Sequence, residues 1–137
     1  KFHIEKSIIN DSVVSITVRN ENEIIFGCDN KTIILWDLNE NKEIKKFKSH
    51  EIIPNLLLYN QNDDNLIVVG HVKINIVNLD TGELLKILEK HEMAITSVLT
   101  VRKNNLLISS SKDSSILIWN LSTGEILKSL NKHNGII

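Results

Sequence analysis

Short runs in which apolar and polar residues alternate recur along the whole chain. In the run 13–18, for example, Val14, Ile16 and Val18 alternate with Ser15 and Thr17. A period of two is typical of β-strands, because successive side chains of a strand point to opposite faces. The pattern predicts twelve strands, over residues 13–18, 24–28, 33–37, 43–47, 53–59, 66–70, 73–78, 84–88, 95–101, 106–110, 116–120 and 126–130.

The connections between these runs are short and polar, as in 19–22, 61–65 and 102–105. Gly82 and Gly124 lie where a tight hairpin turn needs a positive φ, which glycine adopts at low cost. Each group of four runs is therefore expected to form a four-stranded antiparallel meander, and the fold class is expected to be all-β.

The runs belong to an internal repeat. The dipeptides Trp36-Asp37, Val77-Asn78 and Trp119-Asn120 occupy equivalent contexts with spacings of 41 and 42 residues, obtained as 77 − 36 and 119 − 77. The same two spacings separate three histidines, His50, His91 and His133. Two independent markers with one period predict repeats at roughly 8–50, 51–91 and 92–133, with the start of a fourth at 134–137.

This repeat resembles that of the WD-repeat (Trp-Asp) β-propellers, in which about 40–45 residues form the four strands of one blade. A single small sheet cannot bury both faces, so neighbouring sheets have to stack face to face. The resemblance implies three consecutive four-stranded antiparallel blades that form an open arc, as part of a larger β-propeller. By this resemblance, residues 1–137 are one WD-repeat propeller segment.

The third repeat matches the family pattern best. The resemblance assigns a structural hydrogen-bond tetrad to it, in which Asp113 accepts from His91 and further bonds run through Ser109 to the indole N–H of Trp119. The first repeat carries only a partial tetrad, Asn30 and Trp36, because Phe26 stands at the serine position. The second repeat has Val77 at the tryptophan position and His71 at the aspartate position, which removes its tetrad.

Ser109, His91 and Asp113 are also the residue types of a hydrolytic triad. A nucleophilic serine needs an exposed elbow flanked by glycine, whereas Ser109 lies inside the predicted strand 106–110 with no glycine nearby. The histidines recur once per repeat, which would spread them around a ring rather than gather them at a metal. The sequence therefore predicts no catalytic residue, no metal site and no cofactor.

Composition and charge narrow the classes of partner. Sixteen Lys and Arg against seventeen Asp and Glu give a net charge of −1, and only Arg19 and Arg102 are arginines, which disfavours a nucleic-acid partner. No apolar run approaches the ~20 residues of a membrane span, so no membrane partner is expected. The single cysteine, Cys28, fits a reducing compartment, and a cytoplasmic, intracellular location is expected.

We expect a non-catalytic scaffold that docks partner proteins or peptides on propeller rim loops. In the family, the residue before the turn aspartate often projects at the rim, which selects Asp29, Gly70 and Lys112, with Ala94 and Thr96 as weaker candidates. Two alternatives remain open. Segment 79–85 also resembles the repeats of quinoprotein-type propeller oxidoreductases, and the chain could instead be a permanent structural subunit of a large complex.

The two ends carry a further expectation. Segments 1–4 and 134–137 read as the tail of a preceding repeat and the beginning of a following one. A closed propeller needs at least ~4 blades, because ring closure covers the outer faces of the sheets. We therefore expect exposed apolar residues on the first and third repeats, and association with the remaining blades of a larger propeller or with other copies of the chain.

Overall fold

The computed structural model describes residues 12–131. Every predicted run coincides with a strand, and only the run 53–59 begins more than one residue from the strand that it predicts. A single-turn 3₁₀ helix, η1 (Arg102–Asn104), follows the ninth strand. The strands are β1 (Val13–Asn20), β2 (Glu23–Cys28), β3 (Thr32–Asp37), β4 (Lys42–Lys48), β5 (Leu56–Asn60), β6 (Asn65–Val69), β7 (Lys73–Asn78), β8 (Leu84–Glu89), β9 (Ile95–Val101), β10 (Leu106–Ser111), β11 (Ile116–Asn120) and β12 (Ile126–Leu130).

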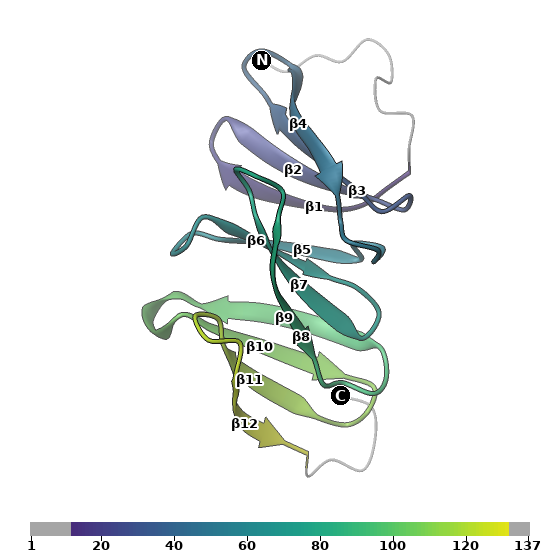
Figure 1. Cartoon of the computed structure of the whole chain (residues 1–137), viewed down its shortest axis with the longest axis vertical. Coiled ribbons are helices and arrows are strands. Elements are labelled where there is room, and N and C mark those ends of the chain that lie inside the picture. The colour runs from purple at the N-terminus through teal and green to yellow at the C-terminus, as the bar shows by residue number, and fades with distance from the viewer. Residues whose placement is uncertain (1–11, 132–137) are drawn as a thin grey trace.

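The strands form three four-stranded antiparallel meanders in chain order: sheet 1 (β1–β4), sheet 2 (β5–β8) and sheet 3 (β9–β12). Figure 1 shows these sheets stacked one after another along the long axis of the molecule, in an open arrangement. The prediction of an all-β fold built from three consecutive four-stranded sheets is confirmed.

The late start of β5 has a local cause. Pro54 has no N–H to donate to a sheet, and the Asn55 amide donates to the carbonyl of Ile53 at 2.8 Å, which bends the chain before Leu56. The Pro54 carbonyl accepts a hydrogen bond of 2.6 Å from the Ser15 hydroxyl on β1. The bend therefore attaches the entrance of sheet 2 to sheet 1.

Two apolar clusters hold the stack together, and sheet 2 contributes one face to each. Its strand β6 is buried along its whole length, which explains why the run of Leu66, Ile67, Val68 and Val69 does not alternate with polar residues. The cluster between sheets 1 and 2 contains Ile25, Ile33, Leu35, Leu57, Leu66, Val68, Val77 and Leu79. The cluster between sheets 2 and 3 contains Ile67, Val69, Ile74, Ile76, Leu88, Leu107, Leu117, Trp119 and Leu121.

Each third strand ends in the same side-chain turn. Asp37, Asn78 and Asn120 each use Oδ1 to accept the backbone N–H two residues further on, at 2.8 Å in all three turns, and also the N–H three residues further on. In sheets 2 and 3 the turn then passes through Gly82 and Gly124, whose φ values of 78° and 82° match the predicted positive φ. The residue after each tryptophan position therefore shapes the turn.

The outer sheets expose apolar side chains. Val14, Ile16 and Val18 on β1 are exposed, as are Leu99 on β9 and Leu130 on β12. The predicted start of a fourth repeat at 134–137, the marker His133 and the first residues of the repeat 8–50 lie outside the described residues.

Candidate functional site

The four residues that the sequence assigned to a tetrad lie on one chain of hydrogen bonds in sheet 3. The indole N–H of Trp119 on β11 donates to Oγ of Ser109 on β10 at 2.9 Å. His91, in the connection between β8 and β9, places Nε2 2.7 Å from Ser109 Oγ and Nδ1 3.1 Å from Asp113 Oδ2. Every polar atom is used if the Ser109 hydroxyl donates to Nε2 and the Nδ1–H donates to the carboxylate.

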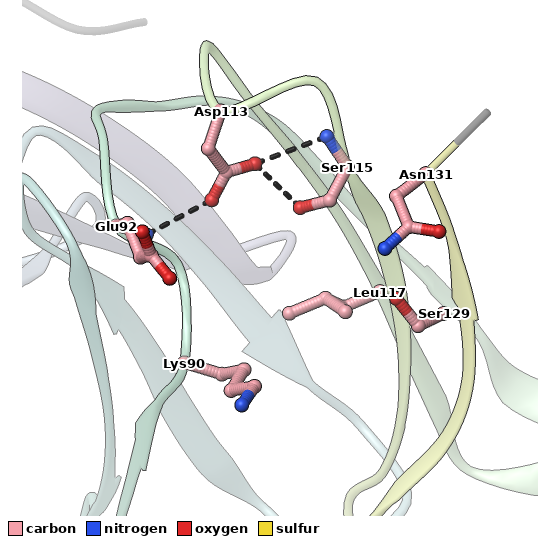
Figure 2. Close-up of a pocket in the computed structure, with 7 residues that line it drawn as sticks. All are labelled: Lys90, Glu92, Asp113, Ser115, Leu117, Ser129 and Asn131. Carbon is pink, nitrogen blue, oxygen red and sulfur yellow. Dashed lines mark hydrogen bonds between the residues drawn. The ribbon is translucent and has the colours of Figure 1, made fainter. Parts of the chain in front are cut away.

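The Asp113 carboxylate joins two loops. It accepts the backbone N–H of Glu92 at 2.9 Å from the β8–β9 connection, and the backbone N–H of Ser115 at 3.0 Å from its own turn. Figure 2 shows these bonds together with that from the Ser115 hydroxyl. Burial alone would raise the pKa of Asp113, but the bonds from Ser115, Glu92 and His91 outweigh it and hold the pKa well below its usual range.

Ser115 is a member of this network that the sequence analysis did not identify. Its hydroxyl donates to Asp113 and also lies 3.1 Å from His91 Nδ1. An aspartate followed two residues later by serine is the pattern of a side-chain turn, so the segment Asp113-Ser114-Ser115 carried a usable signal.

The geometry gives these side chains a structural role. Ser109 is fully buried, and its oxygen is shared between Trp119 and His91. The hydroxyl therefore has no exposed surface at which a substrate could contact it in this arrangement. The network instead fixes the β10–β11 turn against the loop that enters sheet 3, because a satisfied polar chain inside an apolar junction allows few alternative arrangements.

A hollow of about 180 Å³ lies beside the Asp113 carboxylate, between the loop after β8 and the end of β12. It places the cation Lys90 near the anion Glu92, as Figure 2 shows, so its mouth has mixed charge. The remaining lining residues are Ser115, Leu117, Ser129 and Asn131.

Sheet 1 replaces the tetrad by an aromatic contact. Trp36 is buried and its ring lies 6.4 Å from that of Phe26, at an interplanar angle of 56°. The other member of the predicted partial tetrad, Asn30, is exposed in the β2–β3 turn. Among residues 12–131, therefore, packing against Phe26 holds Trp36, whereas a hydrogen bond to Ser109 holds Trp119 at the equivalent position of sheet 3.

Sheet 2 fills the equivalent positions with apolar side chains. The strand register places Val68 opposite Asn75 and Leu66 opposite Val77, just as Ser109 lies opposite Leu117 and Leu107 opposite Trp119. Val68 and Val77 are fully buried. Val68 and Val77 thus occupy the places of Ser109 and Trp119 in sheet 3.

The histidine before sheet 2 has a different partner from His91. His50 Nε2 lies 2.8 Å from the carbonyl oxygen of Gly82, in the β7–β8 turn. The Nδ2 of Asn75 is 3.2 Å from the carbonyl of Ser49, so this loop is held by backbone acceptors rather than by a turn aspartate.

The turns β2–β3, β6–β7 and β10–β11 lie at one edge of the three sheets, which we call the Asp113 rim; it is on the right in Figure 1. The opposite rim carries the β1–β2, β5–β6 and β9–β10 connections. Asp29 and Lys112 are exposed at the Asp113 rim. The backbone N–H of Lys112 donates to the carbonyl of the half-buried Ala94 at 3.0 Å, which attaches the β10–β11 turn to the β8–β9 connection. Thr96 is exposed, and its hydroxyl is 2.9 Å from that of Ser110.

The structure differs from the sequence prediction at Gly70. The β6–β7 turn is one residue shorter than the β10–β11 turn: four residues separate the paired Val69 and Ile74, whereas five separate Ser110 and Ile116. Gly70 therefore matches the strand end, not the exposed turn position, and it is buried against Ile52. The prediction of Gly70 as a rim residue is wrong.

An ion-paired cluster that the sequence did not reveal joins sheets 1 and 2 at the opposite rim. Arg19 donates to both carboxylate oxygens of Asp64, at 2.7 and 3.2 Å, and to Glu23 at 3.1 Å. The Tyr59 hydroxyl also donates to Asp64. Burial raises the pKa of Tyr59 above its usual value. Burial alone would also raise the pKa of Asp64, but the hydrogen bonds from Tyr59 and Arg19 outweigh it and hold that pKa below its usual value.

Within residues 12–131, no group of three or more His, Cys, Asp and Glu side chains is arranged to hold a metal ion. The same part of the chain contains no helix that is long and apolar enough to cross a membrane.

Comparison with known proteins agrees with this architecture. Residues 82–120 match the family described as WD domain, G-beta repeat. The chain is 32% identical over 111 residues to the WD repeat domain-containing protein 83 homolog of Dictyostelium discoideum. This match covers 79% of the chain and 34% of the relative. The chain is 29% identical over 89 residues to the human Pre-mRNA-processing factor 17, covering 62% of this chain and 15% of the relative.

Solved structures show the same fold. The structure of U3-55K superimposes with a TM-score of 0.81 at 17% identity, over 93% of this chain and 42% of that one. The RRP9 WD40 repeats give a TM-score of 0.80 at 16% identity, over 93% and 41%. The chain thus spans about a third of its Dictyostelium relative and less than half of either solved chain. These matches favour WD repeats over the quinoprotein-type alternative, and the chain belongs to the WD-repeat β-propeller family.

Proposed function

We propose that this chain is a non-catalytic interaction scaffold that docks partner proteins or peptides on the Asp113 rim. The observation that carries the proposal is the use of the buried polar residues of sheet 3. His91, Ser109 and Trp119 hold the carboxylate of Asp113, and this carboxylate holds the β10–β11 turn against the β8–β9 connection. The buried polar side chains of sheet 3 thereby hold the exposed loops of the Asp113 rim in place.

The exposed residues at this rim suit a peptide partner. Asp29 on sheet 1 and Lys112 on sheet 3 carry opposite charges, and Lys90 and Glu92 add a second mixed pair at the hollow beside Asp113. Mixed charge at a rim favours oriented docking of a complementary segment and makes association sensitive to salt. The single cysteine supports docking inside the cell, where thiols stay reduced.

A matched pair of charge reversals tests this proposal. Peptides are first selected from a random library on the intact chain, and their affinities are then measured for the chain, for Lys112→Glu and for Lys103→Glu. Lys103 is another exposed lysine, in η1 at the opposite rim. We expect Lys112→Glu to weaken binding about fivefold to tenfold and Lys103→Glu to leave it unchanged.

Thermal unfolding of both variants is the control, and both midpoints are expected to stay close to that of the parent chain. Equal loss of affinity in the two variants would contradict docking at the Asp113 rim. Peptide binding that resists high salt would favour a permanent, apolar contact, as in a structural subunit.

A further inference from the structure

The hollow beside Asp113 has room for one long side chain. Its volume is about 180 Å³, and a protein cavity of roughly 150 Å³ already accepts a molecule of the size of benzene. Figure 2 shows the side chain of the buried Leu117 pointing into the hollow, with Ser129 and Asn131 beside it at the end of β12. The hollow therefore combines an apolar surface with a few polar groups, which is the usual make-up of a binding pocket.

The carboxylate of Asp113 gives the hollow a fixed negative charge. The backbone N–H groups of Glu92 and Ser115 donate to this carboxylate at 2.9 and 3.0 Å, so its position is fixed by both loops. The hydrogen bonds keep the pKa of Asp113 well below its usual range, so the group stays ionised at neutral pH. The side chain of Glu92 adds a second carboxylate to the lining.

Lys90 is the one cation among the residues that line the hollow. It is exposed, and its ammonium lies at the end of a flexible stem that can move into solvent. Two carboxylates and one ammonium give the lining a formal charge of −1 at neutral pH. Because the negative charge at Asp113 is fixed and the positive charge at Lys90 is mobile, the hollow favours a cationic guest.

An arginine side chain matches this lining best. Its methylene stem can lie on Leu117 while its charged end stays near the carboxylates. The guanidinium presents N–H donors in a planar fork, which suits the carboxylate of Glu92 and leaves donors for the hydroxyl oxygen of Ser129. Asp113 already accepts several hydrogen bonds, so it attracts the guest mainly through its charge.

The equivalent place between sheets 1 and 2 has a different lining. The strand register makes Asn75 the equivalent of Leu117, and Ile87 the equivalent of Ser129. The β6–β7 turn, residues 70–72, contains no aspartate. The first junction therefore lacks both the apolar surface and the fixed carboxylate, and the expected preference for arginine belongs to the second junction.

We propose that the hollow binds the arginine side chain of a partner segment that docks on the Asp113 rim. The inference rests on the docking proposed above and names the side chain that the rim selects. In the bound state the guanidinium pairs with the carboxylate of Glu92, the stem packs on Leu117, and the ammonium of Lys90 moves aside into solvent.

The first test needs no partner protein. N-acetyl-arginine methylamide is titrated into the intact chain, and the backbone amide signals are followed by nuclear magnetic resonance. We expect saturable shifts at Glu92 and Ser129 that weaken at high salt, because the attraction is between charges. The citrulline analogue has nearly the same shape without the charge, and it should leave these signals in place. Saturable binding of N-acetyl-glutamate methylamide in its stead would overturn the proposal.

Two charge removals have opposite expected effects on the affinity for the arginine probe. Glu92→Gln should weaken binding about threefold, whereas Lys90→Met, which removes the competing cation, should strengthen binding by a similar factor. Glu51→Gln is the matched control, because Glu51 follows His50 as Glu92 follows His91 and is likewise exposed, and it should leave the affinity unchanged. The reverse signs, or equal affinities in all variants, would contradict an arginine pocket.

The peptides selected on the intact chain separate this inference from docking at the rim. Peptides that lose affinity through Lys112→Glu should contain an arginine, and its replacement by citrulline should weaken them about threefold or more. If such peptides tolerate citrulline, docking at the rim stands and the arginine pocket does not. Near-ultraviolet circular dichroism of Trp36 and Trp119 verifies that each variant is folded.

Discussion

Sheets 2 and 3 have the same strand order and nearly the same register, yet they hold their loops at the Asp113 rim by different means. Sheet 3 uses a polar chain that runs from Trp119 through Ser109 and His91 to Asp113. Sheet 2 buries Val68 and Val77 at the equivalent positions. A four-stranded sheet of this kind therefore forms without the polar chain.

The difference follows from the β6–β7 turn, which is one residue shorter than the β10–β11 turn, and from the side chains beside these turns. The shorter β6–β7 turn has no aspartate to receive a histidine, and His50 instead reaches Gly82 in another turn. Apolar faces build the stack in both sheets, whereas the polar chain fixes one particular turn. Loss of a member of the polar chain should therefore cost more stability in sheet 3 than loss of the equivalent side chain in sheet 1 or 2, and the predictions below test how the sheets differ.

The largest effect is expected from removal of the histidine. His91→Ala removes the ring that joins Ser109 to Asp113 and opens a cavity beside the buried Ser109 hydroxyl, so we expect a loss of about 2–4 kcal/mol in the free energy of unfolding. His50→Ala removes a single bond to a carbonyl and is expected to cost about 0.5–1.5 kcal/mol. Urea titration of the two variants measures both values, and similar losses would contradict the comparison.

The tryptophans provide a conservative version of this test. Trp119→Phe retains most of the buried ring but removes the donor to Ser109, and we expect a cost of about 1–3 kcal/mol. Trp36→Phe is the control, because Trp36 contacts the ring of Phe26 and a phenylalanine preserves an aromatic pair. If denaturant titration shows Trp119→Phe to be as mild as a surface change, the assigned role of the indole N–H is wrong.

Acid should weaken the polar chain. The pKa of Asp113 is lowered in the folded state, so its contribution to stability is complete above the ordinary carboxyl pKa of 3.8 and is lost as the pH falls below that value. Asp113→Asn removes this titration. The stability difference between the chain and Asp113→Asn should therefore shrink as the pH is lowered from neutral toward 3.

The same acid titration has a built-in comparison at the opposite rim. The pKa of Asp64 is also lowered, by Tyr59 and Arg19, so the chain as a whole still loses stability in acid when Asp113 is replaced. A difference between the chain and Asp113→Asn that stays constant with pH would mean that Asp113 contributes nothing through its charge.

The smallest effect concerns the β7–β8 and β11–β12 turns, which pass through Gly82 and Gly124. Gly82→Ala and Gly124→Ala both place a side chain at positive φ, which costs roughly 1 kcal/mol. Gly82 faces the fixed Cβ of Phe47, whereas Gly124 faces the flexible end of Lys86. We expect Gly82→Ala to lower the free energy of unfolding more than Gly124→Ala does. Thermal unfolding should show a difference of less than about 1 kcal/mol between the two variants. The reverse order would mean that Phe47 moves away from an added methyl group more easily than Lys86 does.

Much of the fold could be predicted because its signals are local. Strand periodicity, polar connections and the 41- and 42-residue spacings give the strands and their grouping into sheets. The early start predicted for β5 failed because Ile53 is apolar like a strand residue, and the alternation carries no information on the bend at Pro54. Gly70 was misplaced because a uniform spacing hides a turn that is one residue shorter.

The contacts that the sequence did not reveal lie between sheets. Arg19 and Asp64 are 45 residues apart, and nothing in either segment marks the other as its partner. The alternation shows Lys45 only as a polar residue of the predicted strand 43–47, whereas its ammonium donates to two carbonyls of the β7–β8 turn of the next sheet. Such pairs depend on how one sheet sits on the next, which is set by the packing of many apolar side chains.

The side-chain turns at Asp37, Asn78 and Asn120 have a consequence for the ageing of the protein. The turn needs an oxygen that accepts two amides, and an amide and a carboxylate supply it equally well. Hydrolysis of the Asn78 and Asn120 side chains to aspartate would move the formal net charge from −1 to −3 and leave the turns intact. Any aspartate form that arises in this way should therefore focus at a more acidic pH while its unfolding transition stays in place.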